Sequence, residues 1–265
     1  MPWPNPEHNY LLAALPETVR RRLFPHLESI QMRRGDDLYE SGKQLHYVYF
    51  PTSAIVALLC EMADGTSTET AMVGKEGILG VTLFMGGGAT PGRTIVQFPG
   101  HGFALRVRWL KDEFNHAGPL MHLLLHYTQA LITQMSQIAV CNRHHSIHQQ
   151  LCRWLLMSLD RLPSNELAIT QELIANMLGV RREGITEAAG HLQDTGLIHY
   201  KRGHITILDP PGLEEQACEC YRVVRQEFDR LLPYRQQQKK LPAAHGWRPS
   251  HSVAVAATRQ MSFGH

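Results

Sequence analysis

Cysteine is scarce and unevenly placed in this sequence. The cysteines are odd in number, and the first 59 residues contain none. They are Cys60, Cys141, Cys152, Cys218 and Cys220. So sparse a set does not build the disulfide framework of a small secreted protein, and no secretory signal precedes it. We therefore expect a reduced, cytoplasmic protein.

Long apolar runs and enzyme motifs are also missing. No run approaches the roughly 18 apolar residues of a membrane span, so we expect no membrane partner. Neither a Gly-x-Ser-x-Gly motif nor a phosphate-cradling loop occurs. His46 and His101 each stand alone, whereas a metal-dependent β-roll enzyme uses a His-x-His pair on a strand. We therefore expect no enzymatic activity.

A large excess of charge of one sign is likewise absent. The net charge is +2, and an apolar content of 43% with 19% charged residues is ordinary for a globular protein. Bulk charge therefore does not identify a nucleic-acid partner. Any DNA contact must come from the local placement of a few residues.

Residues 168–208 carry the strongest functional pattern. Thr170 suits a helix N-cap, and Glu172 lies in the first turn, where a carboxylate favours the helix dipole. Gly179 can adopt the left-handed conformation that ends this helix in a sharp turn. A second helix is expected over about 182–195. This spacing predicts a helix-turn-helix, in which the second helix enters the major groove of DNA.

The polar start of the second helix and the hairpin behind it favour binding to double-stranded DNA. Arg182 can donate to a guanine edge, and Glu183 can accept from a cytosine amino group. Residues 199–204 join two short strands, which predicts a wing with cations at its tip. The expected DNA-contacting residues are Thr170, Arg181, Arg182, Glu183, Thr186, Glu187, Lys201 and Arg202.

The rest of the chain divides into segments of different predicted secondary structure. Short β-type segments separated by glycines run from Ile30 to Arg108, which is typical of a sandwich, barrel or roll. A long helical pattern follows, and a closing helix is expected over 213–233. The predicted division is a helical lead-in over 1–28, a β-roll sensor domain over 29–117, a dimerisation helix over 118–145, a winged helix-turn-helix domain over 146–235 and a disordered tail over 236–265.

A heptad seam marks the predicted long helix. Its members alternate at spacings of three and four residues: Met121, Leu124, Thr128, Leu131, Met135 and Ile138. A seam of this length beside a DNA-reading unit predicts a homodimer. The alternative is a helix that packs within its own chain.

A β-roll, a long dimer helix and a C-terminal winged helix-turn-helix together resemble the Crp/Fnr family of bacterial transcription regulators, over about residues 20–208. The resemblance implies an α+β fold whose cyclic-nucleotide-binding-like roll is a double-stranded β-helix. It also implies a homodimer that reads a palindromic operator, with Arg182 and Glu183 at the family's base-reading places. Glu187 replaces the family's usual arginine, so we do not expect a full copy of the familiar half-site. RNA polymerase and a small-molecule effector are further partners that the resemblance implies.

The same resemblance bears on the effector. Members that bind cyclic AMP carry a Gly-Glu pair and then an Arg-Ser or Arg-Thr pair. Gly80 and Val81 align with the first pair and Arg93 and Thr94 with the second, so these four are the expected effector-binding residues. Val81 replaces the carboxylate that accepts from the ribose hydroxyl, a loss of roughly 1–3 kcal/mol. We therefore do not expect cyclic AMP to be the effector. Because no cysteine precedes Cys60, we also do not expect the N-terminal iron–sulfur cluster of oxygen-sensing members. The cofactor stays unknown.

One stretch rich in cysteine and histidine offers an alternative function. It presents two helical faces of ligand-type residues: Cys141, His145, Gln149 and Cys152 on one, His144 and His148 on the other. Such sets bind zinc or respond to redox state, and Cys218 or Cys220 could complete a site. Polar packing at the hinge between domains is the favoured explanation of the set, so we assign no metal ligand from sequence. The alternative is a thiol- or metal-responsive sensor.

Overall fold

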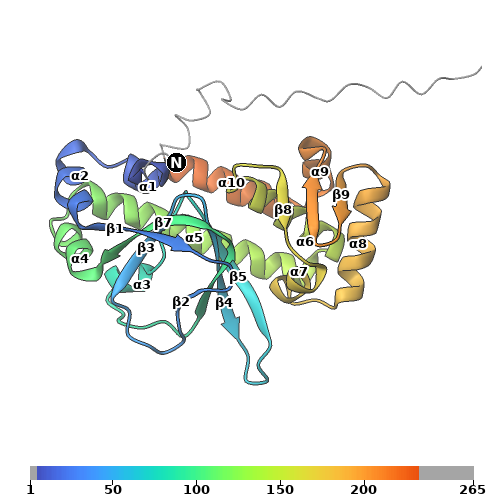
Figure 1. Ribbon diagram of the computed structural model, residues 1–265, viewed down its shortest axis with the longest axis horizontal. Helices are drawn as coiled ribbons and strands as arrows, with labels where there is room; N and C mark the ends of the chain where they lie inside the picture. Colours follow the sequence, from blue (N-terminus) through green and yellow to red (C-terminus); the bar gives the residue numbers. More distant parts are fainter. Residues whose placement is uncertain (1–4, 233–265) are drawn as a thin grey trace, which may run out of the picture.

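The computed structural model describes residues 5–232 and has a β-roll and a winged domain joined by one long helix (Figure 1). The long helix, α5 (Pro119–His144), runs behind the roll towards the winged domain. Among residues 5–232, no helix combines the length and apolar character that crossing a bilayer requires. The predicted tail over 236–265 lies outside the described residues.

The β-type segments between Ile30 and Arg108 form the two facing sheets of the roll. One sheet has the strand order β1-β7-β3 and the other β2-β6-β4-β5, all antiparallel. The strands are β1 (Leu27–Met32), β2 (Asp37–Tyr39), β3 (Tyr47–Pro51), β4 (Ile55–Glu61), β5 (Ser67–Val73), β6 (Arg93–Phe98) and β7 (Gly100–Arg106).

Short helices close the ends of the roll. Asn9 is fully buried: its side-chain oxygen caps the first α-helix, and its amide donates to the Pro51 and Gly77 carbonyls at 2.9 and 2.8 Å. This residue fastens the lead-in to the roll. The elements are η1 (Pro6–His8), α1 (Tyr10–Ala13), α2 (Glu17–Leu23), η2 (Phe24–His26), α3 (Val81–Phe84) and α4 (Val107–Asn115).

The heptad seam predicted for dimerisation faces the protein's own core. Leu124, Leu131 and Ile138 are at most 4% exposed in the single chain. The other members are buried or half-buried: Met121, Thr128 and Met135. These residues therefore pack within their own chain, which is the alternative left open above, rather than forming a free surface for a second chain.

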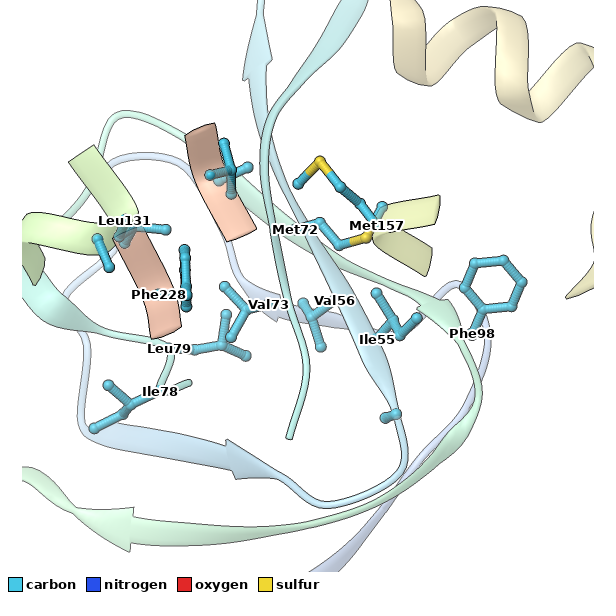
Figure 2. Close-up of a cluster of buried hydrophobic side chains, with 14 of the residues drawn as sticks. Ile55, Val56, Met72, Val73, Ile78, Leu79, Phe98, Leu131, Met157 and Phe228 are labelled. Atoms are coloured by element: carbon cyan, nitrogen blue, oxygen red, sulfur yellow. The ribbon is translucent and has the colours of Figure 1, made fainter. Parts of the chain in front are cut away.

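Helix α10 (Glu219–Leu231) explains this outcome, because it returns from the C-terminal part of the chain and packs along α5. The Phe228 ring meets the Tyr127 ring edge-on, with centroids 6.3 Å apart. Figure 2 shows Leu131 and Phe228 next to the side chains of β4 and β5. Gln134 fixes α5 to the roll by exchanging two 3.2 Å hydrogen bonds with the Met72 backbone.

The winged domain follows α5. Its sheet has the order β8-β10-β9, and helix α8 packs with β9. The closing helix expected over 213–233 is two helices, because Ala217 and Cys218 are extended. The elements before α10 are α6 (Ile147–Leu159), β8 (Glu166–Ala168), α7 (Gln171–Leu178), α8 (Arg182–Asp194), β9 (Ile198–Lys201), β10 (His204–Ile207) and α9 (Pro210–Gln216).

Candidate nucleic-acid interface and effector cavity

Helices α7 and α8 form the predicted helix-turn-helix. The Thr170 hydroxyl accepts from the Leu173 backbone N–H at 3.3 Å, which confirms it as the N-cap of α7. Gly179 ends the helix with a φ of +66°, in the left-handed region that favours glycine. Arg181 is the extended residue that starts α8. The local signals in the sequence therefore dictate this geometry.

The first turns of α8 present charged side chains to solvent. The helix buries Ile185, Ala188, Ala189 and Leu192, as its apolar spacing predicts. Arg181, Arg182, Glu183 and Glu187 are exposed, and among residues 5–232 no ion pair engages any of them. Their donors and acceptors are therefore available to a ligand.

Thr186 has a structural task that the sequence analysis missed. Its hydroxyl donates to the Gln171 side-chain oxygen at 2.8 Å and thereby ties the start of α7 to α8. Gln171 was not predicted as a functional residue, because a glutamine at a helix start carries no distinctive spacing. The pair fixes the angle between the two helices.

The wing lies beside the helix-turn-helix. Strands β9 and β10 are joined by Arg202 and Gly203, whose φ angles of +49° and +80° suit a two-residue hairpin of the primed type. The Ile169 backbone N–H donates to the Gly203 carbonyl at 2.7 Å, which holds the wing tip near the start of α7. Lys201 and Arg202 are exposed there, where cations can meet phosphates.

The winged domain contacts the roll directly through α7. Met177 packs with Ala57 and Leu59 of β4 in a small buried cluster. A β-carbon added at Gly179 would lie 2.8 Å from the Thr68 hydroxyl of β5. The turn of the helix-turn-helix therefore sits against the β4–β5 hairpin in this conformation.

The expected effector-binding residues converge on one cavity. Gly80, Val81, Arg93 and Thr94 all line a cavity of about 200 Å³ in the roll, and Met135 of α5 closes one side. Gly80 has a φ of +98°, and a β-carbon there would lie 2.6 Å from the Tyr39 hydroxyl. Only glycine suits this close approach.

The charge at the cavity rim is already paired. The Arg93 guanidinium donates to both carboxylate oxygens of Asp37 at 2.5 and 2.6 Å and to Glu61 at 3.2 Å. The hydrogen bonds to Asp37 raise the pKa of Arg93. Inside, the buried Thr82 and Thr94 hydroxyls have no hydrogen-bond partner among the described residues. The cavity therefore offers an apolar wall more readily than a free cation.

The cysteine and histidine residues regroup in the structure. Cys152 belongs to the main core, and the His148 ring lies 5.0 Å from that of His191. The residues that do meet are Cys141, His145, Cys218 and Cys220, whose ligand atoms all lie within 4.8 Å of one another. The hydrogen bond between the Cys141 and Cys218 sulfurs lowers the pKa of the Cys218 thiol. Spacing within one helix could not reveal this set, because half of it comes from 77 residues further along the chain.

Comparisons with known proteins agree with this architecture. Residues 149–216 match the Crp-like helix-turn-helix domain family. The chain is 21% identical over 217 residues to the global nitrogen regulator of Synechococcus elongatus, a match that covers 78% of this chain and 97% of that protein.

Solved structures share the fold over most of this chain. A putative transcriptional regulator of the Crp/Fnr family from Eubacterium rectale superposes with a TM-score of 0.62 at 19% identity, over 78% of this chain and 98% of that one. FixK2 from Bradyrhizobium japonicum gives a TM-score of 0.61 at 14% identity, over 72% and 98%. The chain therefore carries a Crp-like helix-turn-helix domain behind a β-roll and a long helix, and its fold is that of solved Crp/Fnr transcription regulators.

Proposed function

We propose that the protein is a homodimer that reads a palindromic operator through α8 and does not respond to cyclic AMP. The observation that carries the DNA-reading part is the exposed start of α8, where Arg181, Arg182 and Glu183 face solvent. Arg182 reads a guanine and Glu183 a cytosine, while Lys201 and Arg202 of the wing contact phosphates. Thr170 and Glu187 complete the contact surface, and a contact with RNA polymerase stays a prediction.

The dimer contact lies on a different face of α5 from the predicted seam. Exposed residues recur there at heptad spacing, one position along from the buried seam: His122, Leu125, Gln129, Ile132, Ser136, Ala139 and Arg143. Leu125 and Ile132 are 46% and 54% exposed, and the neighbouring Val140 is 47% exposed. Apolar residues at this spacing favour a second copy of the same helix as the occupant. The two winged domains then present their α8 helices to two half-sites.

In vitro selection from a random DNA library tests the palindrome. We expect an inverted repeat whose half-site centres lie about 34 Å apart, or a whole multiple of this distance. A selected sequence with a single half-site and no repeat would contradict the dimeric mode of reading. Selection with Arg182→Ala beside the wild type identifies the base pair that Arg182 reads.

Two features of the cavity support the lack of response to cyclic AMP. Val81 offers no acceptor for a ribose hydroxyl, and Arg93 is already neutralised by Asp37 and Glu61. An anionic phosphate would have to compete with both carboxylates for this guanidinium. The largely apolar lining suits instead an uncharged effector.

Calorimetry with cyclic AMP tests this part. We expect no heat of binding from the wild type, and binding gained only when Val81→Glu restores the acceptor and Asp37→Asn releases Arg93. Micromolar binding by the wild type would overturn the assignment. Val81→Leu, which keeps the residue apolar, is the matched control.

A further inference from the structure

We propose that Cys141, His145, Cys218 and Cys220 bind a structural zinc ion that joins the α5–α6 hinge to α10. The four ligand atoms lie within 4.8 Å of one another, and the residues are buried or half-buried. The proposal rests on this geometry alone and does not depend on the proposed function.

Two of the ligand–ligand distances match those of a tetrahedral site, and the others are at most 4.8 Å. Zn–S bonds of about 2.3 Å and Zn–N bonds of about 2.0 Å place neighbouring ligand atoms roughly 3.5–3.8 Å apart. The Cys141 and Cys218 sulfurs are 3.5 Å apart, and the Cys220 sulfur lies 3.7 Å from His145 Nδ1. Three cysteines and one histidine form a closed set typical of structural zinc rather than of a catalytic metal with an open position.

The ring nitrogen of His145 that does not face Cys220 lies near a carboxylate, as in many zinc sites. His145 Nε2 lies 3.4 Å from a Glu219 carboxylate oxygen, on the opposite side of the ring from the sulfurs. A hydrogen bond from Nε2–H to Glu219 leaves Nδ1 unprotonated and aimed at the metal. Partners of this kind orient the ring and strengthen its bond to zinc.

A buried arginine supplies the charge balance. Arg153 is 1% exposed, and its Nε donates to the Cys141 sulfur at 3.2 Å. Among residues 5–232, no salt bridge within 4 Å engages this guanidinium, and the buried Glu69 carboxylate is the acidic group that interacts with it. A buried charge requires a counter-charge, so the cysteine sulfurs would add to that of Glu69. Three thiolates around Zn²⁺ leave a net charge of about −1, which Arg153 neutralises.

The position gives the ion a mechanical role. Cys141 lies in the last turn of α5, His145 in the link to α6, and Cys218 and Cys220 at the start of α10. The ion therefore fixes the direction in which the chain leaves the long helix for the winged domain. It also holds α10 on the face of α5 that the predicted seam occupies.

Metal analysis of the untagged full-length protein, purified without chelators, tests the proposal. We expect about one zinc per chain in the wild type and near-complete loss in Cys141→Ser, Cys220→Ser and His145→Ala. Cys60→Ser and His144→Ala are matched controls, because both residues are exposed and outside the cluster, and they should keep the zinc.

Two further measurements do not depend on variants that lose a ligand. Glu219→Gln, at an exposed residue, should weaken zinc about tenfold in competition with a chelator. Cobalt-substituted wild type should show the visible bands of a tetrahedral thiolate site. The proposal is overturned if the wild type carries no stoichiometric metal, carries iron or copper instead, or contains a Cys141–Cys218 disulfide.

Discussion

Replacing Ile132 with alanine tests the proposed dimer at the most exposed apolar position of α5. Ile132 is 54% exposed in the single chain, so about half of its side chain remains to be covered by a partner. Full burial of such a side chain contributes roughly 1.5–3 kcal/mol, so the exposed half contributes about 1 kcal/mol in each copy. A two-fold dimer contains the residue twice, which makes about 2 kcal/mol and raises the dissociation constant about 30-fold. Ile132→Glu should separate the chains altogether, because two carboxylates would then face each other.

Sedimentation velocity over a dilution series measures this change. The wild type should sediment at twice the 30.0 kDa mass of the chain, and Ile132→Ala should shift to the monomer at higher concentration. Met85→Ala is the control, because Met85 is 61% exposed but belongs to the roll. A wild-type monomer, or a dimer that tolerates both Ile132 variants, would refute the assignment of this face.

Three further predictions concern the interface, the core and pH. Arg182→Ala should weaken binding to the selected operator by roughly 1–3 kcal/mol and relax the preference at one G·C pair. Lys201→Ala should instead lower the affinity for all DNA sequences alike and reduce the slope of log affinity against log salt concentration by about one. Equal losses of affinity on every sequence for both variants would make Arg182 a contact to the DNA backbone. Arg161 and Glu76 form a buried ion pair at 2.7 Å, so Glu76→Gln should destabilise the protein by about 3–5 kcal/mol and lower the melting temperature by about 6–20 °C; a change below about 2 °C would show that the pair adds little. Burial raises the pKa of Glu69 from 4.5 to about 7, so the folded state binds this proton more tightly than the unfolded state. The free energy of unfolding should therefore fall as pH rises from 4.5 to 7. Urea titrations should show a smaller fall in Glu69→Gln, and the same pH dependence in variant and wild type would contradict the role of Glu69.

Local signals in the sequence were enough to predict the DNA-reading unit. Thr170 caps α7, Gly179 turns the chain, and Arg202 with Gly203 closes the wing. Each of these tasks is decided within a few residues, so the residue type alone indicates the conformation. The strands of the roll could be predicted for the same reason, since glycines mark the turns between them.

Long-range packing was the part that spacing could not predict. Two stripes of α5 have heptad spacing, and the stripe of Leu124 and Leu131 is the more apolar. The sequence analysis therefore assigned it to a second chain, although it is covered by Phe228 of α10 and by the roll. The meeting of Cys141 with Cys218 has the same cause, since only the return of α10 brings them together.

Strand β4 belongs both to the effector cavity and to the surface on which α7 rests. Leu58, Leu59 and Cys60 line the cavity, and Leu59 also packs, together with Ala57, with Met177 of α7. The distance between ligand and DNA-reading unit is thus the thickness of one strand, and no relay of residues is needed to connect them. Thermodynamic linkage then acts in both directions with equal strength. If an effector in this cavity tightens the contact of α7 with β4, and DNA binding loosens that contact, each ligand must lower the affinity for the other by the same factor.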